Sequence, residues 1–569
     1  MDKQAVRHTL EQLAAFLEFK RESRFRVRAF QNAARAIAAY PGDVAQAAAT
    51  GALRRLKGVG PAPVEVVHEL LATGRSSALD ELREHVPPGL VEMLRIPGLG
   101  VSKVRQIHER LAIESLFELE DAASDGRLAS LPHFGAKTAA NVLKGIASLR
   151  QSAGLRLFHH ALDEVDGVRR ALSALGGVLR VEVAGAVRRR CEIIRELTLV
   201  VVHAGDGARA ALVKRLGAAP GVTEFAGKEG SVTVRFASGT VVDVFLTTPT
   251  GFGLCWIRAT GSSAHVAELE ARARATDVAL GPRSEFPDEA SVYRALGLAW
   301  VPPELREGRG EIEAAANGSL PRMVEQSDLR GFLHCHSNYS DGTVTIAQWA
   351  AACREAAYEW VGITDHSQSA AYAGGLRRED VARQHAEIDS VNRDVGGIRV
   401  LKGVEADILA DGTLDYGAEV LDRFDFVIGS IHSRFGMAEA EMTRRVLTAM
   451  DDPRLGILGH PTGRLLLQRE PYAIDLEQIL AKAALRGIAV EVNADPHRLD
   501  LDWRMLRRAR ELGVTVSIGA DAHSTAGMTN VAVGVGIARK GWLEPPQVLN
   551  TRDADGFLAL TRRRRAGSD

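Results

Sequence analysis

The chain has 569 residues, of which 46% are hydrophobic and 25% are charged, and its formal net charge is −1. This composition is typical of soluble globular proteins and excludes wholesale disorder, a collagen-like repeat and a coiled-coil rod. A net charge this close to zero also excludes a nucleic-acid binder that depends on bulk positive charge alone. At about 100–200 residues per domain, the length predicts about three to five domains.

The sequence shows no sign of export or membrane insertion. No apolar run approaches the ~18–20 residues that span a bilayer, and the first residues lack the apolar core of a signal peptide. The four cysteines lie far apart without a C-x-x-C motif, which disfavours a disulfide framework or a thiolate zinc site. We therefore expect a cytoplasmic protein that makes no membrane contact.

Residues 1–150 are predicted to form short helices separated by Gly/Pro turns. A turn with an apolar-x-Gly-apolar-Gly frame occurs in two full copies and one variant. The copies contain Gly58 and Gly60, Gly98 and Gly100, and His133 and Gly135, so that His133 replaces a glycine in the variant. Glycines at such turns let backbone N–H groups and a helix N-terminus approach a phosphate closely. The turns resemble helix-hairpin-helix motifs, which implies sequence-independent contacts to a DNA backbone.

The pattern changes near residue 155, where strands mix with helices. The expected strands are residues 178–183, 197–202, 232–236 and 241–246. Residues 265–315 return to helix and loop, and residues 317–321 are expected to be a linker.

A regular alternation of strands and helices begins near residue 330. The expected strands end at His336, His366, Asp407, His432, His460, Asn493 and Asp521, and helices between them include residues 345–357, 379–393, 439–450, 475–486 and 501–512. Alternating segments of this length predict a parallel sheet, either open or closed into a barrel.

Most of these strands end near a histidine or an acidic residue, and the carboxyl ends of parallel strands form one rim. The candidate metal ligands are His334, His336, Asp341, His366, Glu405, His432, His460, Asp521 and His523. His334 and His336 lie two apart on a strand, so both are expected to face one site, whereas Cys335 faces the core. Imidazoles and carboxylates without thiolates suit Mn²⁺, Zn²⁺ or Fe²⁺. A lone histidine in a strand is more often a satisfied core residue, but this many beside acids favours a metal site.

The motifs around these residues resemble those of PHP-domain phosphoesterases. The matching runs are His334-Cys-His-Ser-Asn-Tyr-Ser-Asp341-Gly, Ile363-Thr-Asp-His366-Ser, Gly403-Val-Glu405-Ala-Asp, Gly429-Ser-Ile-His432, Gly459-His460-Pro and Gly519-Ala-Asp521-Ala-His523. The resemblance implies a distorted (β/α)₇ barrel and a site for up to three metal ions. It assigns His334, His336, Glu405 and Asp521 to one ion, Glu405, His432 and His460 to the second, and Asp341, His366 and His523 to the third.

Such a site suits hydrolysis of a phosphoester. Clustered divalent ions lower the pKa of a bound water and neutralise phosphate charge as the leaving oxygen departs. Arg434 and Arg498, near strand ends, are candidate phosphate contacts, and a role as ordinary surface arginines is the alternative.

Over its whole length the chain resembles bacterial family X DNA polymerases that carry a C-terminal PHP domain. Residues 1–40, 184–189, 260–262 and 293–306 carry this likeness outside the barrel. It implies a multidomain fold with an all-α helix-hairpin-helix region, an α+β nucleotidyltransferase-like palm and thumb, and the C-terminal α/β barrel. The implied parts are a helical 8-kDa-like domain at 1–85, a fingers-like domain at 86–152, the palm at 153–250, a thumb-like part at 251–316, a linker at 317–328 and the PHP domain at 329–569.

The expected polymerase site departs from the family pattern. Two-metal phosphoryl transfer needs carboxylates on a Gly-Asp-x-Asp run and on a neighbouring strand. Here Glu196 fills the first position, Thr198 the second, and only Asp243 keeps its acid. The Gly-Ser pair that binds the triphosphate reads Gly185-Ala186. We therefore expect poor Mg²⁺ binding at the palm and weak or absent templated synthesis.

The sequence thus predicts a DNA-repair protein whose barrel is a metal-dependent 3′→5′ exonuclease. Lysine-dependent lyase chemistry is not expected, because Val66 stands where the family places that lysine. The expected partner is DNA, as primer-template, gapped duplex or 3′ ends, and the expected state is a monomer. The alternatives are a gap-filling DNA polymerase in which Glu196 and Asp243 suffice, a small-molecule phosphatase of the histidinol-phosphatase type, and a DNA-end clamp without catalysis.

Overall fold

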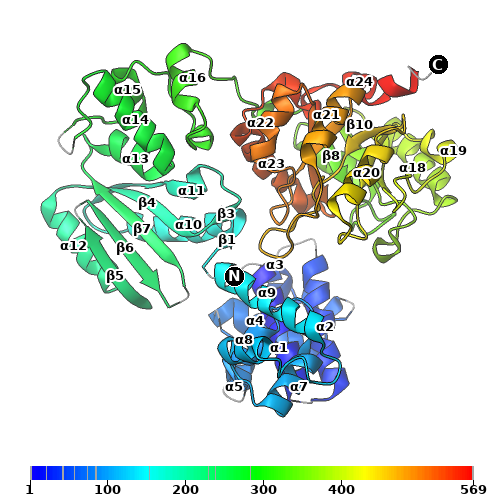
Figure 1. The fold of residues 1–569 in the computed structure, drawn as a ribbon, viewed down its shortest axis with the longest axis horizontal. Helices are drawn as coiled ribbons and strands as arrows, with labels where there is room; N and C mark the ends of the chain where they lie inside the picture. Colours follow the sequence, from blue (N-terminus) through cyan, green and yellow to red (C-terminus); the bar gives the residue numbers. More distant parts are fainter. Residues whose placement is uncertain are drawn as a thin grey trace. The chain divides into compact units, whose positions relative to one another are not determined.

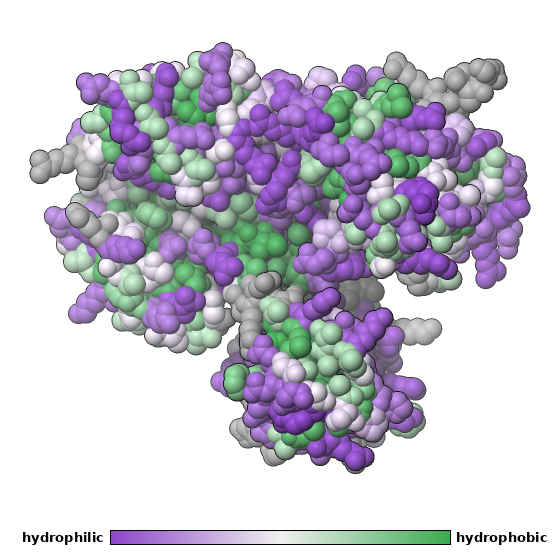
Figure 2. Space-filling model, viewed as in Figure 1, coloured by the Kyte–Doolittle hydropathy of each residue, from purple (hydrophilic) through white to green (hydrophobic). Residues whose placement is uncertain are grey.

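The computed structural model describes residues 3–20, 22–40, 44–56, 58–73, 75–83, 86–152, 154–228, 230–237, 239–281 and 284–566. The chain divides into two compact units, Met1–Ala153 and Gly154–Asp569 (Figure 1). Within the described ranges, no helix is both long enough and apolar enough to cross a membrane. Hydrophilic residues cover much of the face drawn in Figure 2, with apolar patches between them.

The first unit is helical, as predicted. Its α-helices are α1 (Lys3–Phe19), α2 (Arg24–Ala39), α3 (Val44–Ala49), α4 (Pro61–Thr73), α5 (Ser77–Arg83), α6 (Pro88–Met93), α7 (Val101–Leu111), α8 (Leu116–Ser124) and α9 (Ala136–Ser152). On α1, Val6, Leu10 and Leu13 recur at helical spacing, and all three are buried in one core with residues of α2 and α7. The short helices can exist because this shared apolar core, rather than helix propensity, stabilises them.

The second unit begins with a mixed sheet whose strand order is β2-β4-β7-β6-β5. These strands are β2 (Val178–Val183), β4 (Glu196–His203), β5 (Val222–Lys228), β6 (Ser231–Phe236) and β7 (Val241–Thr247). Strand β4 runs parallel to β7, and the other neighbours are antiparallel. The four expected strands are present, but β5 was not foreseen. This edge strand is exposed along most of its length, so its sequence lacks the alternation that marks a half-buried strand.

Helices and a two-stranded antiparallel sheet of β1 and β3 complete this part of the second unit. They are β1 (Arg156–Leu157), α10 (Phe158–Ser173), α11 (Gly185–Arg188), β3 (Ile193–Ile194), α12 (Asp206–Gly217), α13 (Phe252–Thr260), α14 (Ser263–Ala275), α15 (Glu289–Ala295) and α16 (Glu311–Asn317). Glu289 of α15 forms an ion pair of 2.6 Å with Arg188 of α11. It forms a second ion pair, of 2.5 Å, with the fully buried Arg306. Burial alone would raise the pKa of Glu289, but the hydrogen bonds from these two arginines lower it to about 2.

The C-terminal part is a closed barrel of seven parallel strands, which confirms the closed form of the predicted sheet. Its strands are β8 (Gly331–Cys335), β9 (Trp360–Ile363), β10 (Arg399–Asp407), β11 (Phe426–Ser430), β12 (Leu455–Leu458), β13 (Ala489–Asn493) and β14 (Val516–Ala522). Its helices are α17 (Ile346–Glu355), α18 (Asp380–Asp394), α19 (Ala418–Leu421), α20 (Glu439–Ala449), α21 (Leu476–Arg486), α22 (Trp503–Glu511), α23 (Asn530–Lys540) and α24 (Ala554–Ala566). Strand β14 pairs with β8 and so closes the barrel.

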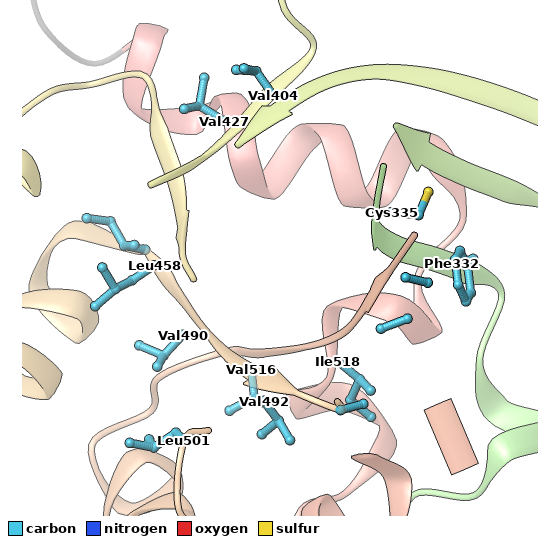
Figure 3. Packing of buried hydrophobic residues seen from close by; sticks show 14 of the residues in the cluster. Phe332, Cys335, Val404, Val427, Leu458, Val490, Val492, Leu501, Val516 and Ile518 are labelled. Atoms are coloured by element: carbon cyan, nitrogen blue, oxygen red, sulfur yellow. The ribbon is translucent and has the colours of Figure 1, made fainter. Parts of the chain in front are cut away.

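Two apolar layers hold the barrel together. Figure 3 shows the larger layer, in which Phe332, Val404 and Val490 point away from the strands, and Cys335 lies in it as expected. A second cluster of residues from the strands packs on Phe557 and Leu558 of α24. These α24 residues therefore belong to the barrel's own core, and the carboxyl ends of the strands carry the polar residues.

Candidate metal centre

The nine candidate ligands lie at or just beyond the carboxyl ends of the barrel strands. His334 lies within β8 and His336 directly follows it, Glu405 lies within β10, and Asp521 lies within β14. The others stand in the connections that follow strands: Asp341, His366, His432, His460 and His523. Seven of the nine are less than 10% exposed in their side chains, and Asp341 and His523 form the more open side of the cluster.

His334, His336 and Asp521 form one group whose ligand atoms all lie within 4.8 Å of one another. The Asp521 Oδ1 atom lies 3.3 Å from His336 Nε2 and 3.7 Å from His334 Nε2. Glu405 adjoins this group, because its Oε1 atom lies 3.3 Å from His334 Nε2. These four residues are the set that the family resemblance assigned to one ion.

Glu405 is also the centre of a second group. Its Oε2 atom lies 2.8 Å from His366 Nδ1, and its Oε1 atom lies 3.4 Å from His432 Nε2. His460 Nε2 lies 3.0 Å from the same Oε1 atom. One fully buried carboxylate thus faces histidines from several strands, which is the position that a bridging ligand between two ions requires.

The third group contains Asp341, His366 and His523, together with His336. His523 Nε2 lies 3.3 Å from Asp341 Oδ1, and His366 Nε2 lies 3.7 Å from Asp341 Oδ2. The rings of His336 and His523 stack with their centroids 4.3 Å apart. The three groups share members, so the nine side chains form one continuous cluster.

The backbone reaches this geometry in a way that strand periodicity did not predict. His334, His460 and Asp521 have positive φ angles of 57°, 21° and 48°. The register between β14 and β8 shifts at this point, so His334 and His336 meet at one site through an irregular backbone rather than through regular alternation. A left-handed conformation costs a non-glycine residue about 1–3 kcal/mol, and such residues cluster at functional sites.

Two acids missed by the sequence reasoning orient the histidines from behind. Glu491 accepts a hydrogen bond from His334 Nδ1 at 2.5 Å and from the backbone N–H of His460 at 2.8 Å. Asp407 bonds to His432 Nδ1 at 2.6 Å. A carboxylate on one ring nitrogen fixes the tautomer and presents the other nitrogen as a metal ligand. Both acids lie on predicted strands, but only the folded barrel shows which histidine each one meets.

The electrostatics of the cluster fit bound cations. Burial lowers the pKa of His336 to about 3, with two neighbouring histidines acting in the same direction. Burial would also lower the pKa of His432, but Glu405 and Asp407 raise it to about 10. Despite its burial, Glu405 has a pKa well below its usual range because the histidines around it stabilise its charge. The carboxylates that stabilise a proton on His432 would equally stabilise a divalent ion, and such an ion displaces protons from the imidazoles that bind it.

The two arginines proposed as phosphate contacts differ in their surroundings. Arg498 lies at the cluster, with its Nε atom 3.5 Å from Asp521 Oδ2, and its side chain is mostly buried. Arg434 lies in the exposed connection after β11 and has a positive φ of 57°.

The palm positions are assembled but do not form a comparable group. Thr198 on β4 pairs with Asp243 on β7, so Glu196, Thr198 and Asp243 share one face of the sheet. Thr233 donates a hydrogen bond of 2.6 Å to Asp243, and Thr198 is buried against Gly185. Among the residues that the structure describes, every group of three or more side chains placed to hold a metal lies in the barrel.

The three glycine turns of the first unit share one backbone conformation. Gly58 and Gly98 have φ angles of 94° and 85°, and His133 adopts the same left-handed region with a φ of 68°. Gly60, Gly100 and Gly135 directly precede α4, α7 and α9, and no atom would meet a Cβ at these positions. The space beside the last glycine of each turn is thus open. Val66 on α4 is buried in the helical core.

Comparison with known proteins matches these parts of the chain. Family models for a helix-hairpin-helix domain, a SAM-like helix-hairpin-helix tandem and a PHP domain match residues 1–76, 90–148 and 333–495. The fold and the site therefore define a multidomain protein that joins helix-hairpin-helix units to a PHP domain.

The whole chain also has a full-length relative. The chain is 34% identical over 571 residues to the DNA polymerase/3′-5′ exonuclease PolX of Bacillus subtilis. The alignment covers 98% of this chain and 99% of the relative. The chain belongs to the PolX family. Over 234 residues the chain is 26% identical to a "Probable phosphatase" of Syntrophotalea carbinolica, covering 38% of this chain and 90% of that protein. A "Probable phosphatase" of Caldanaerobacter subterraneus is 30% identical over 139 residues, covering 23% of this chain and 52% of that protein.

Proposed function

We propose that this PolX family member hydrolyses DNA phosphodiesters in its barrel and removes nucleotides from 3′ ends. The observation that carries the proposal is the contrast between its two candidate sites. Eight histidine and carboxylate side chains form metal-binding groups at the barrel rim, and His460 joins them through Glu405, whereas the palm positions retain only Glu196 and Asp243 as acids. The exonuclease part of the name "DNA polymerase/3′-5′ exonuclease PolX" of the full-length relative supports the same assignment.

The residues at the rim fit a site for up to three divalent ions, with Mn²⁺, Zn²⁺ and Fe²⁺ as the candidates. We assign His334, His336, Glu405 and Asp521 to one ion, Glu405, His432 and His460 to a second, and Asp341, His366 and His523 to a third. When bound, such ions supply an activated water and neutralise the charge that develops on the phosphate.

The protein's own groups then position the reacting phosphodiester. Glu491 and Asp407 hold the imidazoles of His334 and His432 in one orientation. Arg498, beside Asp521, is placed to bind a phosphate oxygen, and Arg434 on the exposed rim is a candidate for the next phosphate.

The rest of the chain would hold DNA without reading its sequence. The turns at Gly58, Gly60, Gly98, Gly100 and Gly135, each followed by a helix N-terminus, suit phosphate oxygens of the DNA backbone. We assign these turns to domains at 1–85 and 86–152, followed by the palm at 153–250, the thumb-like part at 251–316, the linker at 317–328 and the PHP domain at 329–569. The proposed substrates are primer-template, gapped duplex and other 3′ ends, bound by a monomer in the cytoplasm.

A gel assay with a 5′-fluorescein oligonucleotide and Mn²⁺ tests this function. The wild type should shorten the labelled strand, and His336→Ala should abolish shortening. Asp243→Asn in the palm is the matched control and should leave shortening unchanged. Full activity in His336→Ala would overturn the proposal.

A small-molecule phosphatase is the second candidate, because the barrel's relatives are named as probable phosphatases. The two functions differ in the bond that is cleaved. Faster hydrolysis of p-nitrophenyl phosphate than of the phosphodiester thymidine 5′-p-nitrophenyl phosphate would favour the phosphatase, and the reverse order would favour the exonuclease.

A further inference from the structure

A cavity of about 550 Å³ lies within the second unit, between the palm and one connection of the barrel. On the palm side its lining includes Ala186 and Glu196, which the family resemblance assigns to triphosphate and metal binding, and the neighbouring Arg195. On the barrel side it is lined by the connection at residues 464–471. Its volume falls in the range of about 300–1,000 Å³ that is usual for small-ligand sites.

This connection joins the cavity to the metal centre. It begins four residues after His460, and its turn is closed by pairing of Leu465 with Arg469. The backbone N–H of Leu466 donates to the His497 carbonyl at 2.7 Å, and Arg464 Nε donates to the Arg498 carbonyl at 2.9 Å. The connection that lines the cavity is therefore hydrogen-bonded to the segment whose Arg498 side chain reaches Asp521.

Most charges of the cavity already have partners. Arg189 pairs with Glu307 at 2.9 Å, and Arg464 pairs with Asp502 at 2.7 Å. Arg504 pairs with Asp502 at 2.8 Å and with the buried Glu192 at 3.2 Å. The pair between Glu192 and Arg504 links the segment before β3 to α22. Because these charges neutralise one another, they offer a ligand little net charge.

Two arginines of the cavity remain available to an anion. Arg195 is exposed, and its side chain makes no hydrogen bond or ion pair with any residue that the structure describes. Arg469 donates to the Gly463 carbonyl and lies 4.2 Å above the Phe435 ring, without a carboxylate partner in the described part of the chain. Burial and the neighbouring Arg498 both lower the pKa of Arg469, so an anion there would relieve repulsion between two cations.

The remaining lining suits a nucleoside rather than a bare anion. Leu465, Leu466, Leu467 and Pro471 form an apolar side, and Leu467 stands at the tip of the turn with a φ of 62° and 37% exposure. Glu196 and Glu470 add carboxylates that can accept from the N–H groups of a base or from a sugar hydroxyl. Phosphate, apolar and acceptor groups thus occur together in one cavity.

We propose that this cavity binds one nucleotide unit of the single strand whose 3′ end enters the barrel, with Arg195 and Arg469 on its phosphates. The former nucleotide site of the palm would thus serve as an upstream subsite of the hydrolase. This inference rests on the proposed exonuclease function and adds a substrate-binding role for the palm.

The test compares R195Q with R215Q in the full-length protein. Arg215 is an exposed arginine on α12 outside the cavity, so R215Q removes the same charge elsewhere on the palm. For a single-stranded oligonucleotide, R195Q should raise KM about fivefold with kcat unchanged, the size expected for one exposed ionic contact. The plot of log binding constant against log salt should become shallower by about 0.7. Hydrolysis of thymidine 5′-p-nitrophenyl phosphate, in which a nitrophenyl group replaces the upstream strand, should not change.

Binding of a fluorescein-labelled oligonucleotide, followed by anisotropy with EDTA present, separates this inference from the function on which it rests. If the wild type cleaves nothing, the exonuclease proposal fails, while weaker binding in R195Q than in R215Q would still support the cavity as a strand site. Equal binding and equal KM in the two variants would overturn the inference. The inference would also be overturned if free thymidine monophosphate competes with the oligonucleotide in the wild type and in R215Q but not in R195Q. The cavity would then bind a free nucleotide.

Discussion

The barrel and the palm each gather side chains at the ends of parallel strands, but only one gathers enough donors for a metal centre. In the barrel, Glu405 lies within 3.4 Å of His334, His432 and His460, so one carboxylate connects three strands. In the palm, Asp243 instead accepts a hydrogen bond from Thr233 and faces the uncharged Thr198. The difference shows that parallel strands bring side chains together at both places, whereas only the barrel strands carry enough imidazoles and carboxylates for a metal centre.

The largest effect that separates the two regions is expected from removing the proposed bridging carboxylate of the barrel. We expect Glu405→Gln to lower phosphodiester hydrolysis by at least about 10³-fold, because the first two proposed ion sites lose their shared ligand. Turnover of thymidine 5′-p-nitrophenyl phosphate measures the effect. Glu355→Gln, an exposed charge removal on α17, is the control and should retain full activity. Substantial activity in Glu405→Gln would show that the barrel cluster is not the hydrolytic site.

The ion pairs of Glu289 are expected to stabilise the part of the second unit that precedes the barrel. Glu289→Gln leaves Arg188 and the fully buried Arg306 without their anion, which should lower the free energy of unfolding by about 3–5 kcal/mol. Urea unfolding of both proteins at pH 7 measures this difference.

The same glutamate gives a pH dependence of known sign. Its folded-state pKa of about 2 lies below its ordinary value of 4.5, so its contribution to stability is complete above pH 4.5. That contribution falls as the pH drops from 4.5 toward 2, and the difference between wild type and Glu289→Gln should shrink over this range. A difference that stays constant down to pH 2 would mean that the ion pairs do not stabilise the fold.

The acids that bond to the histidines are expected to strengthen metal binding in the barrel. Glu491→Gln should weaken metal binding about 10–100-fold, because the amide no longer fixes the His334 tautomer as a carboxylate does. Titration of the metal-free protein with Mn²⁺ or Zn²⁺, followed by calorimetry, gives the affinity directly. Glu477→Gln, which removes an exposed charge on α21, is the control. Equal affinities in the two variants would contradict the role of Glu491.

The smallest expected effect concerns DNA binding by the glycine turns. Gly98→Ala places a side chain at a φ of 85° and should cost about 1 kcal/mol of folding stability while weakening duplex binding severalfold. His133→Gly is the matched change, since it relieves the same conformation at a φ of 68° and should not weaken binding. Anisotropy with a labelled duplex measures both. Unchanged binding in Gly98→Ala would remove this turn from the proposed DNA interface.

Much of this architecture could be predicted from local sequence signals. The seven barrel strands and the positions of the nine rim residues follow from apolar runs that end in polar residues. Strand β5 escaped because both of its faces are largely exposed. The positive φ of His334 and the bond from Glu491 to His334, across 157 residues, depend on barrel closure and leave no local signal. The cavity beside Arg195 likewise exists only once the barrel connection packs near the palm.

One reaction tests the central claim that the barrel, and not the palm, is the working site. A 5′-labelled primer on a longer template is incubated with the protein, Mn²⁺ and all four deoxynucleoside triphosphates, and the products are separated by size. The account predicts a shortened primer, with shortening lost in Asp521→Asn and kept in Asp243→Asn. A lengthened primer, with extension lost in Asp243→Asn, would contradict it and would show that Glu196 and Asp243 still support synthesis.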